Sequence, residues 1–474
     1  MAESVVKTTA EKIIDPQHAS KRISLKEKVS YGFGDFGNGF MFDLGQSYLT
    51  NFYTDVAGIS AAAAAGVFSI TKIFDAFMDP LAGSIIDSRT PGKHGKFRPV
   101  MMVSSVLLAI MTVIIFTMPS GLSPTMKIVY AYATYMAWGI LYSFTNVPYG
   151  SLASVMTRNV DDRSFMASTR QAGSIGAQLV TGVAFVPIML LFSNTKAGYT
   201  ITAAIMAFIG ICGFFICYIN TKEHIHAENS RSKERETMKD YLRVVFTNRP
   251  LWSLILMTLF TISAMNTNNQ MMIYFCKYNL NNIGLQPIIN FIMMGCSVAG
   301  ITLIPFLVKK FGKKKTAIGG LIIGVVADAL NFVIPTNIVT FIILVTIGYV
   351  ALAIPNGVTW AFVSDTIDYG HWHTGVRKEG ITYAAFNFSR KIAQSIAALI
   401  SAGILAATGY IANAHQSSTT LLGIKGAMTI YPAVALLLAA IIITFLYNLP
   451  DDKFKQIAND LENGRWEKGT FIQG

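Results

Sequence analysis

The sequence is poor in charged residues. Only 14% of its 474 residues are Asp, Glu, Lys or Arg, whereas soluble domains average about 25%. Apolar residues make up 52% of the chain, and its mean hydropathy is positive. This composition excludes a single water-soluble core. It predicts an all-α membrane protein, a bundle of helices surrounded by membrane lipid.

Motifs of catalysis and of nucleotide or metal binding are absent from the sequence. The chain has no HExxH, no GxSxG and no P-loop, which argues against an enzyme and predicts no cofactor. Its four cysteines lie in or beside apolar segments without a CxxC pair, so we interpret them as packing residues. The net charge of +12 is spread over many short loops, which does not indicate a nucleic-acid partner.

Twelve apolar segments are long enough to span a bilayer. Their centres fall near residues 43, 72, 108, 140, 178, 208, 262, 297, 324, 350, 396 and 435. The polar tail 1–28 is not a signal peptide, because the first apolar run after it is a full spanning segment. A charged loop at 221–249 divides two predicted halves, 29–220 and 250–448, and a polar tail follows at 449–474.

Most of the 38 Lys and Arg residues lie on one side of the predicted membrane, in the two tails and in the loops after the even-numbered segments. The loops on the opposite side hold only Lys127, Lys196, Lys277 and Lys425. The positive-inside rule therefore places both termini in the cytoplasm, with the chain in the inner (cytoplasmic) membrane.

The two halves contain similar short runs at corresponding places. The fourth segment ends in NVPYGSLASV from Asn146, and the tenth ends in NGVTWAFVSD from Asn356. The fifth carries TRQAGSIGA around Arg170, and the eleventh carries SRKIAQSIA around Arg390. Two six-helix repeats around a central cavity are the architecture of the major facilitator superfamily.

Two aspartates, Asp75 and Asp79, lie within the second apolar segment, in KIFDAFMDP. A carboxylate at the bilayer centre costs about 2.5 kcal/mol or more, so it persists where it faces water or a cation. A spacing of four places both on one helical face. With Lys72 a turn earlier, they predict a site for Na⁺ or H⁺. The alternative is a fixed ion pair with Lys72, although one lysine does not neutralise two acids.

Several runs resemble the glycoside–pentoside–hexuronide:cation symporter family, the family of melibiose permease. They are YGFGDFGNGF, FYTDVAGIS, KIFDAFMDP, GKHGKFRP, SDTIDYG and FSRKIAQ, and together they cover nearly the whole chain. The stretches GDFGNGFMFDLGQ and SFTNVPYGSLASVMT look most like members associated with sulfoquinovose catabolism. The resemblance implies cation-coupled sugar transport.

In that family the acidic pair forms the cation site, and a hydroxyl and a carboxylate of the fourth helix complete it. This chain has Ser143 at the hydroxyl position and Asn146 where galactoside carriers have an aspartate. An amide oxygen coordinates Na⁺ but adds no charge. The coupling ion is therefore Na⁺ or H⁺, with H⁺ favoured by the missing carboxylate.

The expected sugar site also differs from that of galactoside carriers. Gly39 replaces an aspartate and Gly150 replaces an aromatic residue, whereas the basic residues Arg170 and Lys391 remain. A cavity that loses carboxylates and keeps cations favours an anionic sugar, either a hexuronide or a sulfonated sugar of the sulfoquinovose type. The alternative is that Arg170 pairs with Asp43 or Asp35 and contacts no ligand.

Other polar residues at membrane depth are candidates for contacts with sugar hydroxyls. They are Asp43, Gln46, Asn266, Asn269, Asn356, Trp360 and Asn387. A further group is expected in the loop after the tenth segment and consists of Asp365, Asp368, Arg377 and Glu379. We expect this group to pair with the loop GKHGKFRP and hold the cytoplasmic side closed in the outward-facing state.

The sequence thus predicts a cation-coupled symporter of an anionic sugar or glycoside, working as a monomer by alternating access. Two alternatives stay open within carriers, namely an exporter or exchanger of a small organosulfonate and a symporter of a neutral glycoside or pentoside. A channel is less consistent with the sequence, because its two halves differ in charge.

Overall fold

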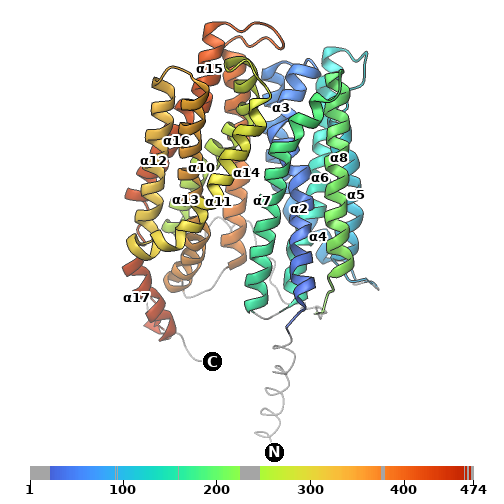
Figure 1. Ribbon diagram of the computed structural model, residues 1–474. Helices are drawn as coiled ribbons and strands as arrows, with labels where there is room; N and C mark the ends of the chain where they lie inside the picture. Colours follow the sequence, from blue (N-terminus) through green and yellow to red (C-terminus); the bar gives the residue numbers. More distant parts are fainter. Residues whose placement is uncertain are drawn as a thin grey trace, which may run out of the picture.

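The computed structural model describes residues 22–90, 92, 94–157, 160–224, 246–374, 379–463, 465–466 and 469–470. In these ranges the chain forms a bundle of long helices that run between two opposite ends of the molecule (Figure 1). We call the end at which α2 begins the terminal end, since α17, close to the carboxyl terminus, also lies there. The opposite end is the distal end.

Two series of helices follow each other along the chain. The first comprises α2 (Leu25–Ser47), α3 (Leu49–Asn51), the π-helical η1 (Phe52–Val56), α4 (Ala61–Asp87), α5 (Arg98–Ile115), α6 (Pro124–Met156), α7 (Val160–Leu190) and α8 (Thr195–Asn220). The second comprises α10 (Arg249–Tyr274), the π-helical η2 (Phe275–Asn279), α11 (Leu285–Phe311), α12 (Lys313–Val333), α13 (Ile338–Thr374), α14 (Glu379–Ala407), α15 (Ser418–Met428) and α16 (Ile430–Phe445). After them come α17 (Asp451–Glu462) and a hairpin of β1 (Arg465–Trp466) with β2 (Gly469–Thr470).

The predicted all-α membrane fold is confirmed. The described residues form twelve spans when α2–α3–η1, α10–η2 and α15–α16 are each counted as one. Ten of these are long and apolar enough to cross a membrane by length and composition alone. The other two are α2 and α6, whose polar side chains meet inside the bundle, as where Asn38 donates to the Tyr142 hydroxyl at 3.2 Å. Such pairing offsets the cost of polar groups at membrane depth.

Polar residues before the helices explain where several of them begin. Ser24 and Glu27 form a capping box at the start of α2, each side chain accepting from the other residue's backbone N–H at 3.2 Å. Ser60 and Ser123 accept the same type of bond before α4 and α6. Each cap satisfies a backbone donor that the first helical turn leaves unpaired.

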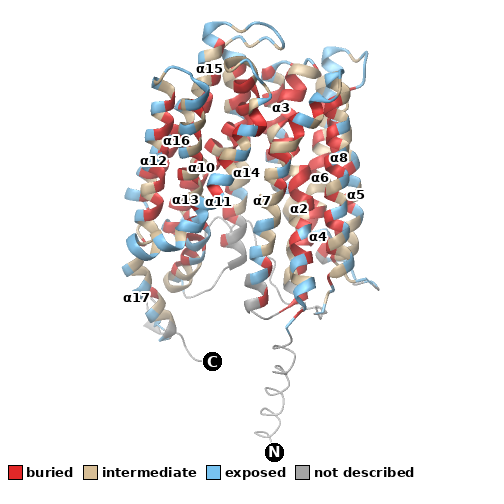
Figure 2. Cartoon of the chain, viewed as in Figure 1, coloured by how far each residue is buried: buried red, intermediate tan, exposed pale blue. Residues whose placement is uncertain are grey.

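The outer faces of the bundle expose many large apolar side chains, among them Phe291, Leu303 and Phe306 of α11. The buried residues lie where helices face one another (Figure 2). A soluble protein rarely exposes so much apolar surface, whereas lipid solvates it without cost.

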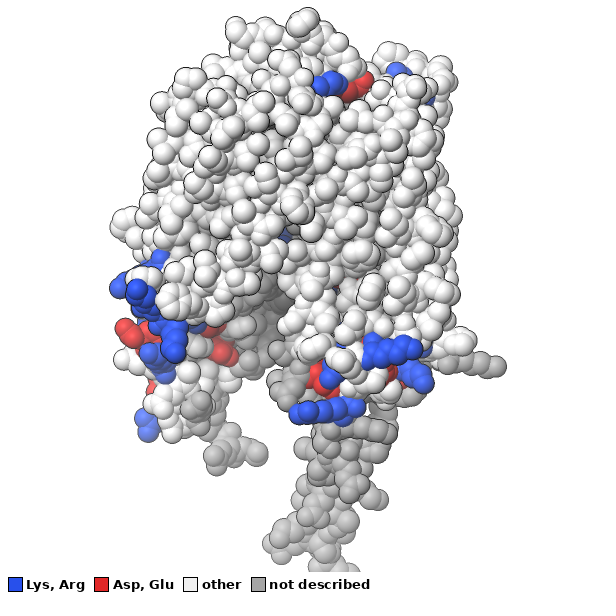
Figure 3. Space-filling view, in the orientation of Figure 1, with Lys and Arg blue, Asp and Glu red and all other residues white. Residues whose placement is uncertain are grey.

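Helices of each series pack mainly with members of the same series. Two pairs of helices pack against each other between the series. One pair is α4 with α14, and the other is α7 with α11. On the face shown in Figure 3, Lys and Arg gather in two groups at the terminal end, and the surface is hollowed between them. On this face, the described residues of the two halves are therefore separated at the terminal end.

One expectation about local structure is wrong. Asp365 and Asp368 were expected in a loop after the tenth segment, but they lie within α13, which continues to Thr374. The helix extends well beyond its apolar part. Between Asp368 and Thr374 the sequence has no proline and a single glycine, Gly370, and a helix tolerates one glycine.

Candidate cation and sugar site

Asp79 connects the two halves at the centre of the bundle. Its Oδ1 accepts a hydrogen bond of 2.6 Å from Ser143 on α6, and its Oδ2 forms an ion pair with Lys391 on α14. The Lys391 ammonium also donates to the carbonyl of Asp75 at 3.3 Å. The Asp79 side chain is 30% exposed, so an incoming ion or solute can reach this ion pair.

Asp75 lies deeper, 4% exposed. Its Oδ2 is 4.0 Å from the ammonium of Lys72, and its Oδ1 is buried without a hydrogen-bond partner among the described residues. Gly139 on α6 lacks a Cβ and thereby leaves room for this carboxylate. The acid pair is thus accompanied by two lysines, of which the sequence reasoning considered only Lys72.

The Lys72 ammonium is surrounded by aromatic rings. It lies 5.1 Å from the ring centroid of Phe42, 5.8 Å from that of Tyr135 and 5.7 Å from that of Trp138. The negative faces of such rings stabilise a cation by roughly 0.5–2 kcal/mol each. This surrounding, together with the nearby Asp75, explains how a lysine that is 4% exposed can persist here.

Arg170 does not present a free cation to the cavity. Its Nε donates to Asp35 on α2 at 3.1 Å, and its guanidinium lies 5.0 Å from the ring centroid of Tyr149. A Cβ on Gly150 would lie 3.9 Å from an Arg170 nitrogen, so the small residue leaves space for the guanidinium. Of the two interpretations left open, the structure shows the pair with Asp35. The expectation that no acid neutralises Arg170 and Lys391 is wrong for this conformation.

The remaining sugar-site candidates separate into three groups. Asp43 and Asn269 line a common pocket. Gln46 meets Gln394 of the other half at 3.4 Å. The last group has contacts with protein but differs in burial. Asn266 is buried and donates to its own helix at Ile262. Asn356 lies 3.9 Å from the sulfur of Met265, and Asn387 on α14 is half-buried like it. Trp360 is exposed and packs edge-on against Phe386 beside Arg390.

Two other predictions differ from the structure. Asn146, expected at the cation site, instead accepts from Asn38 at 3.5 Å, because its position on α6 faces α2. Asp365 pairs with Lys313 of its own half rather than with the loop around Lys96. That loop is bound by Glu223, which accepts from three of its backbone N–H groups at 2.8–3.0 Å. Arg377 lies outside the described residues, as does the side chain of Glu379.

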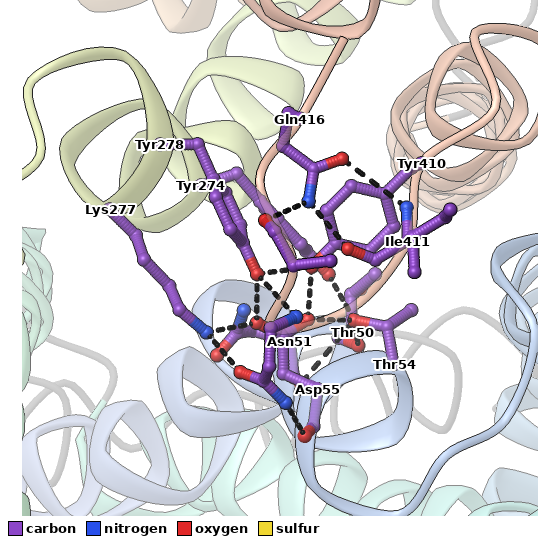
Figure 4. Close-up of polar contacts among 12 residues, drawn as sticks. Thr50, Asn51, Thr54, Asp55, Tyr274, Lys277, Tyr278, Tyr410, Ile411 and Gln416 are labelled. Atoms are coloured by element: carbon purple, nitrogen blue, oxygen red, sulfur yellow. Dashed lines mark hydrogen bonds and ion pairs between the residues drawn. The ribbon is translucent and has the colours of Figure 1, made fainter.

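The distal end contains a polar cluster that the sequence reasoning missed (Figure 4). Asp55 of η1 is bound by Lys277 at 2.5 Å, by Tyr278 at 2.9 Å and by Tyr410, all from the second half. Asn413 donates to the Asp55 carbonyl at 2.7 Å. We call these five residues the distal cluster.

The two π-helical segments at this end are built alike. After η1, Ala57 N–H bonds to Phe52 O and Ile59 N–H to Tyr53 O. After η2, Leu280 N–H bonds to Phe275 O and Asn282 N–H to Cys276 O. The wider turns bring Asp55 of one half to Lys277 of the other. Two features of the sequence could have indicated this contact. Phe52 and Phe275 occupy the same position in the two segments, and Asp55 lies within FYTDVAGIS.

The arrangement is that of a solute carrier. The Asp79 side chain at the centre is 30% exposed, while the distal cluster joins the halves at one end of the bundle. No three His, Cys, Asp or Glu side chains gather into a metal site in the part of the chain that the structure describes. A polar site at the junction of two helical repeats, open to one side, defines a secondary transporter.

Comparison with known proteins identifies the family. Residues 30–451 match the family model of MFS/sugar transport proteins, and the chain belongs to this family of membrane transporters, which are not enzymes. It is 50% identical over 453 residues to the "Uncharacterized symporter YjmB" of Bacillus subtilis (strain 168), covering 95% of this chain and 98% of that protein.

A more distant relative and a solved structure extend the comparison. The "Putative sulfoquinovose importer" of Escherichia coli (strain K12) is 34% identical over 441 residues, covering 93% of this chain and 94% of that protein. The crystal structure of a bacterial homolog of the human lysosomal transporter Spinster, inward-facing and unoccupied, superposes with a TM-score of 0.61 at 14% identity, covering 94% and 98% of the two chains. The latter supports the fold alone.

Proposed function

We propose that this protein is a proton-coupled symporter of an anionic sugar. The observation that carries the proposal is the ion pair between Asp79 of the first half and Lys391 of the second. A proton on Asp79 would remove the partner of Lys391. The released ammonium, at membrane depth, then needs another anion, because an unpaired charge there is costly.

The charges at the centre support the same conclusion. Around the Asp79–Lys391 pair lie Asp35, Asp43 and Asp75, with Lys72, Arg170 and Arg390, and Asp328 is buried in the span of α12. A proton on Asp79 leaves Lys391 as an uncompensated positive charge, which a monoanionic sugar would offset. By linkage, proton and anionic sugar then each increase the affinity for the other. The preference for an anion therefore follows from protonation of Asp79 and not from a cavity that is net positive at rest.

Protons fit the site better than Na⁺. Sodium in a protein site is held by several oxygen atoms, as hard cations are. Here Asp79 is bound by one hydroxyl and one ammonium, and the amide of Asn146 is engaged with Asn38. A carboxylate that exchanges an ammonium for a proton requires no further ligands.

We further propose that residues 29–220 and 250–448 move as two units in a monomer, with the terminal end in the cytoplasm. The Lys and Arg residues at that end support this orientation by the positive-inside rule (Figure 3). The open terminal end and the joined distal end then correspond to an inward-facing conformation of an inner-membrane protein.

Transport by purified protein in proteoliposomes tests the proposal. Under an inward pH gradient, we expect accumulation of sulfoquinovose or a hexuronide, the former suggested by the named relative. Replacing the pH gradient by a Na⁺ gradient should abolish accumulation. Preferred uptake of an uncharged glycoside, or accumulation driven by Na⁺ alone, would contradict the proposal.

A further inference from the structure

A second polar pocket lies between the two halves, closer to the distal end than the Arg170–Asp35 pair. Helices α2 and α7 of the first half and α10 and α11 of the second form its walls. The lining residues are Asp43, Ser47, Gln178, Thr181, Gly182, Asn269, Asn290 and Met294. Gln178 follows Arg170 by eight positions on α7, which is about 12 Å along a helix.

The pocket contains one carboxyl group and no basic residue. Whereas Asp35, Asp75 and Asp79 each face a Lys or Arg, the lining around Asp43 supplies amides and hydroxyls only. The Thr181 hydroxyl in this wall is buried and lacks a hydrogen-bond partner among the described residues. Hydrogen-bonding groups are therefore available here to a neutral part of a ligand, and no basic residue is available to an anionic group.

We propose that this pocket binds a hydroxyl group of the transported sugar and thereby directs the anionic group of the sugar toward Lys391. The inference rests on the proposed function and names the groups that would decide which sugar is accepted. A carboxylate accepts hydrogen bonds from hydroxyls, while amides both donate and accept. A few placed polar groups of this kind fix the orientation of a ligand.

The width of the pocket depends on Gly182. Asn290 donates to the Gly182 carbonyl at 2.9 Å. A Cβ at Gly182 would lie 3.2 Å from the Asn290 amide nitrogen and 3.3 Å from the Met294 methyl. The absence of a side chain thus keeps space for a ligand beside Asn290, and Gly182→Ala would narrow the pocket without removing a polar group.

Uptake kinetics of Asp43→Asn test the inference. For the sugar that the wild type transports, we expect the half-saturating concentration to rise by about tenfold, the usual loss for a buried hydrogen bond. The maximal rate should change far less. For the deoxy analogue that lacks the hydroxyl bound by Asp43, wild type and variant should differ little. Gln178→Ala, Asn290→Ala and Gly182→Ala should raise half-saturation as well.

Thr302→Ala on α11 is the matched control, because this hydroxyl is exposed on the outer face and bonds only to its own helix at Ala299. Unchanged half-saturation in all four pocket variants would overturn the inference. So would an Asp43→Asn variant that loses accumulation with unaltered half-saturation, since that would assign Asp43 to coupling.

The two proposals fail differently. If the wild type accumulates none of the sugars under a pH gradient, the proposed function fails. If the wild type transports and the pocket variants match it, only the pocket assignment fails. For any variant that does not elute as a monodisperse protein, substrate protection of a cysteine introduced at Gln178 against a thiol reagent replaces the kinetic measurement. Lack of protection contradicts the inference.

Discussion

The two ends of the molecule use ion pairs in different ways. At the distal end, Asp55 of the first half is held by Lys277, Tyr278 and Tyr410 of the second. At the terminal end, Lys28 of α2 pairs with Asp162 of α7, whereas Lys313 of α12 pairs with Asp365 of α13 and with Asp451 of α17. Among the described residues, the same types of side chain therefore join the two helix series at one end and stabilise each series separately at the other.

This difference indicates which contacts must break during transport. A rocking motion of two rigid halves leaves the pairs within a half intact and separates the pairs between halves. The Asp55 side chain is 3% exposed, so water weakens its contacts little. Burial raises the pKa of the Tyr410 hydroxyl, and the Asp55 carboxylate raises it further, which keeps this hydroxyl protonated as a donor.

The largest effect is expected from breaking the central contact between the halves. Asp79→Asn removes the group that would exchange a lysine for a proton, so accumulation under a pH gradient should fall to equilibration while sugar exchange persists. Ser143→Ala, which removes only the 2.6 Å hydrogen bond to Asp79, should lower accumulation by roughly tenfold or less. An Asn variant that concentrates sugar as the wild type does would refute the coupling role.

A large effect is also expected at the distal cluster. Asp55→Asn leaves Lys277 without its anion, and removing one partner of a buried pair costs roughly 3–5 kcal/mol. The population open at the distal end should rise by roughly a hundredfold to a few thousandfold. Labelling of Ser47→Cys, placed in the pocket beneath the cluster, by an impermeant thiol reagent from the distal side measures this opening. Equal labelling with and without Asp55→Asn would show that the cluster does not hold this end closed.

The matched change at the terminal end should act differently. Asp365→Asn breaks a pair inside the second half, so we expect a lower melting temperature and little change in the Ser47→Cys labelling. The sequence-based hypothesis, in which Asp365 holds the halves together in the outward-facing state, instead predicts reduced distal labelling. The direction of the labelling change decides between these two accounts.

The smallest effect concerns Asp162, which lies outside the spanning segment of α7. Burial raises the pKa of its carboxyl, but hydrogen bonds from Lys28 at 2.7 Å and from Ile23 N–H at 2.9 Å bring the pKa below its ordinary value. The stabilising contribution is therefore present at neutral pH and is lost as the pH falls below about 3.9, the ordinary value, and through the folded pKa. The melting temperatures of wild type and Asp162→Asn should differ slightly at pH 7, and the difference should shrink as the pH falls below about 3.9 and vanish once the pH is below the folded pKa. A difference that persists unchanged in acid would exclude this origin.

The sequence predicted the spans and the residues of the acidic pair with few errors. Apolar length identifies a spanning helix without knowledge of its neighbours, and Asp75 and Asp79 stand out because they interrupt such a run. The part of α13 that follows its apolar segment was predicted as a loop. Hydropathy identifies only the apolar part of a helix and gives no sign that the helix continues beyond it.

The partners of the charged residues were harder to predict. Arg170 had two possible acids on one helix, and choosing Asp35 over Asp43 requires the rotation of α2 against α7. Lys391 was predicted as a free cation, since its partner Asp79 lies 312 positions away. The pair of Asp55 with Lys277 was not predicted. Single charged residues close to a membrane surface are common, so neither residue alone indicates a contact between the halves.

The sequence by itself determined the membrane-spanning class, the number of helices and the sites where charge enters the membrane. These follow from the transfer free energy of each segment, a sum over neighbouring residues. Only the tertiary structure decided which acidic and basic residues form ion pairs, including the pair of Lys391 with Asp79 between the halves. It also decided at which end of the molecule the two halves are in contact. Those outcomes depend on how helices rotate and pack against one another, and an ion pair changes its energy within a few ångströms of separation.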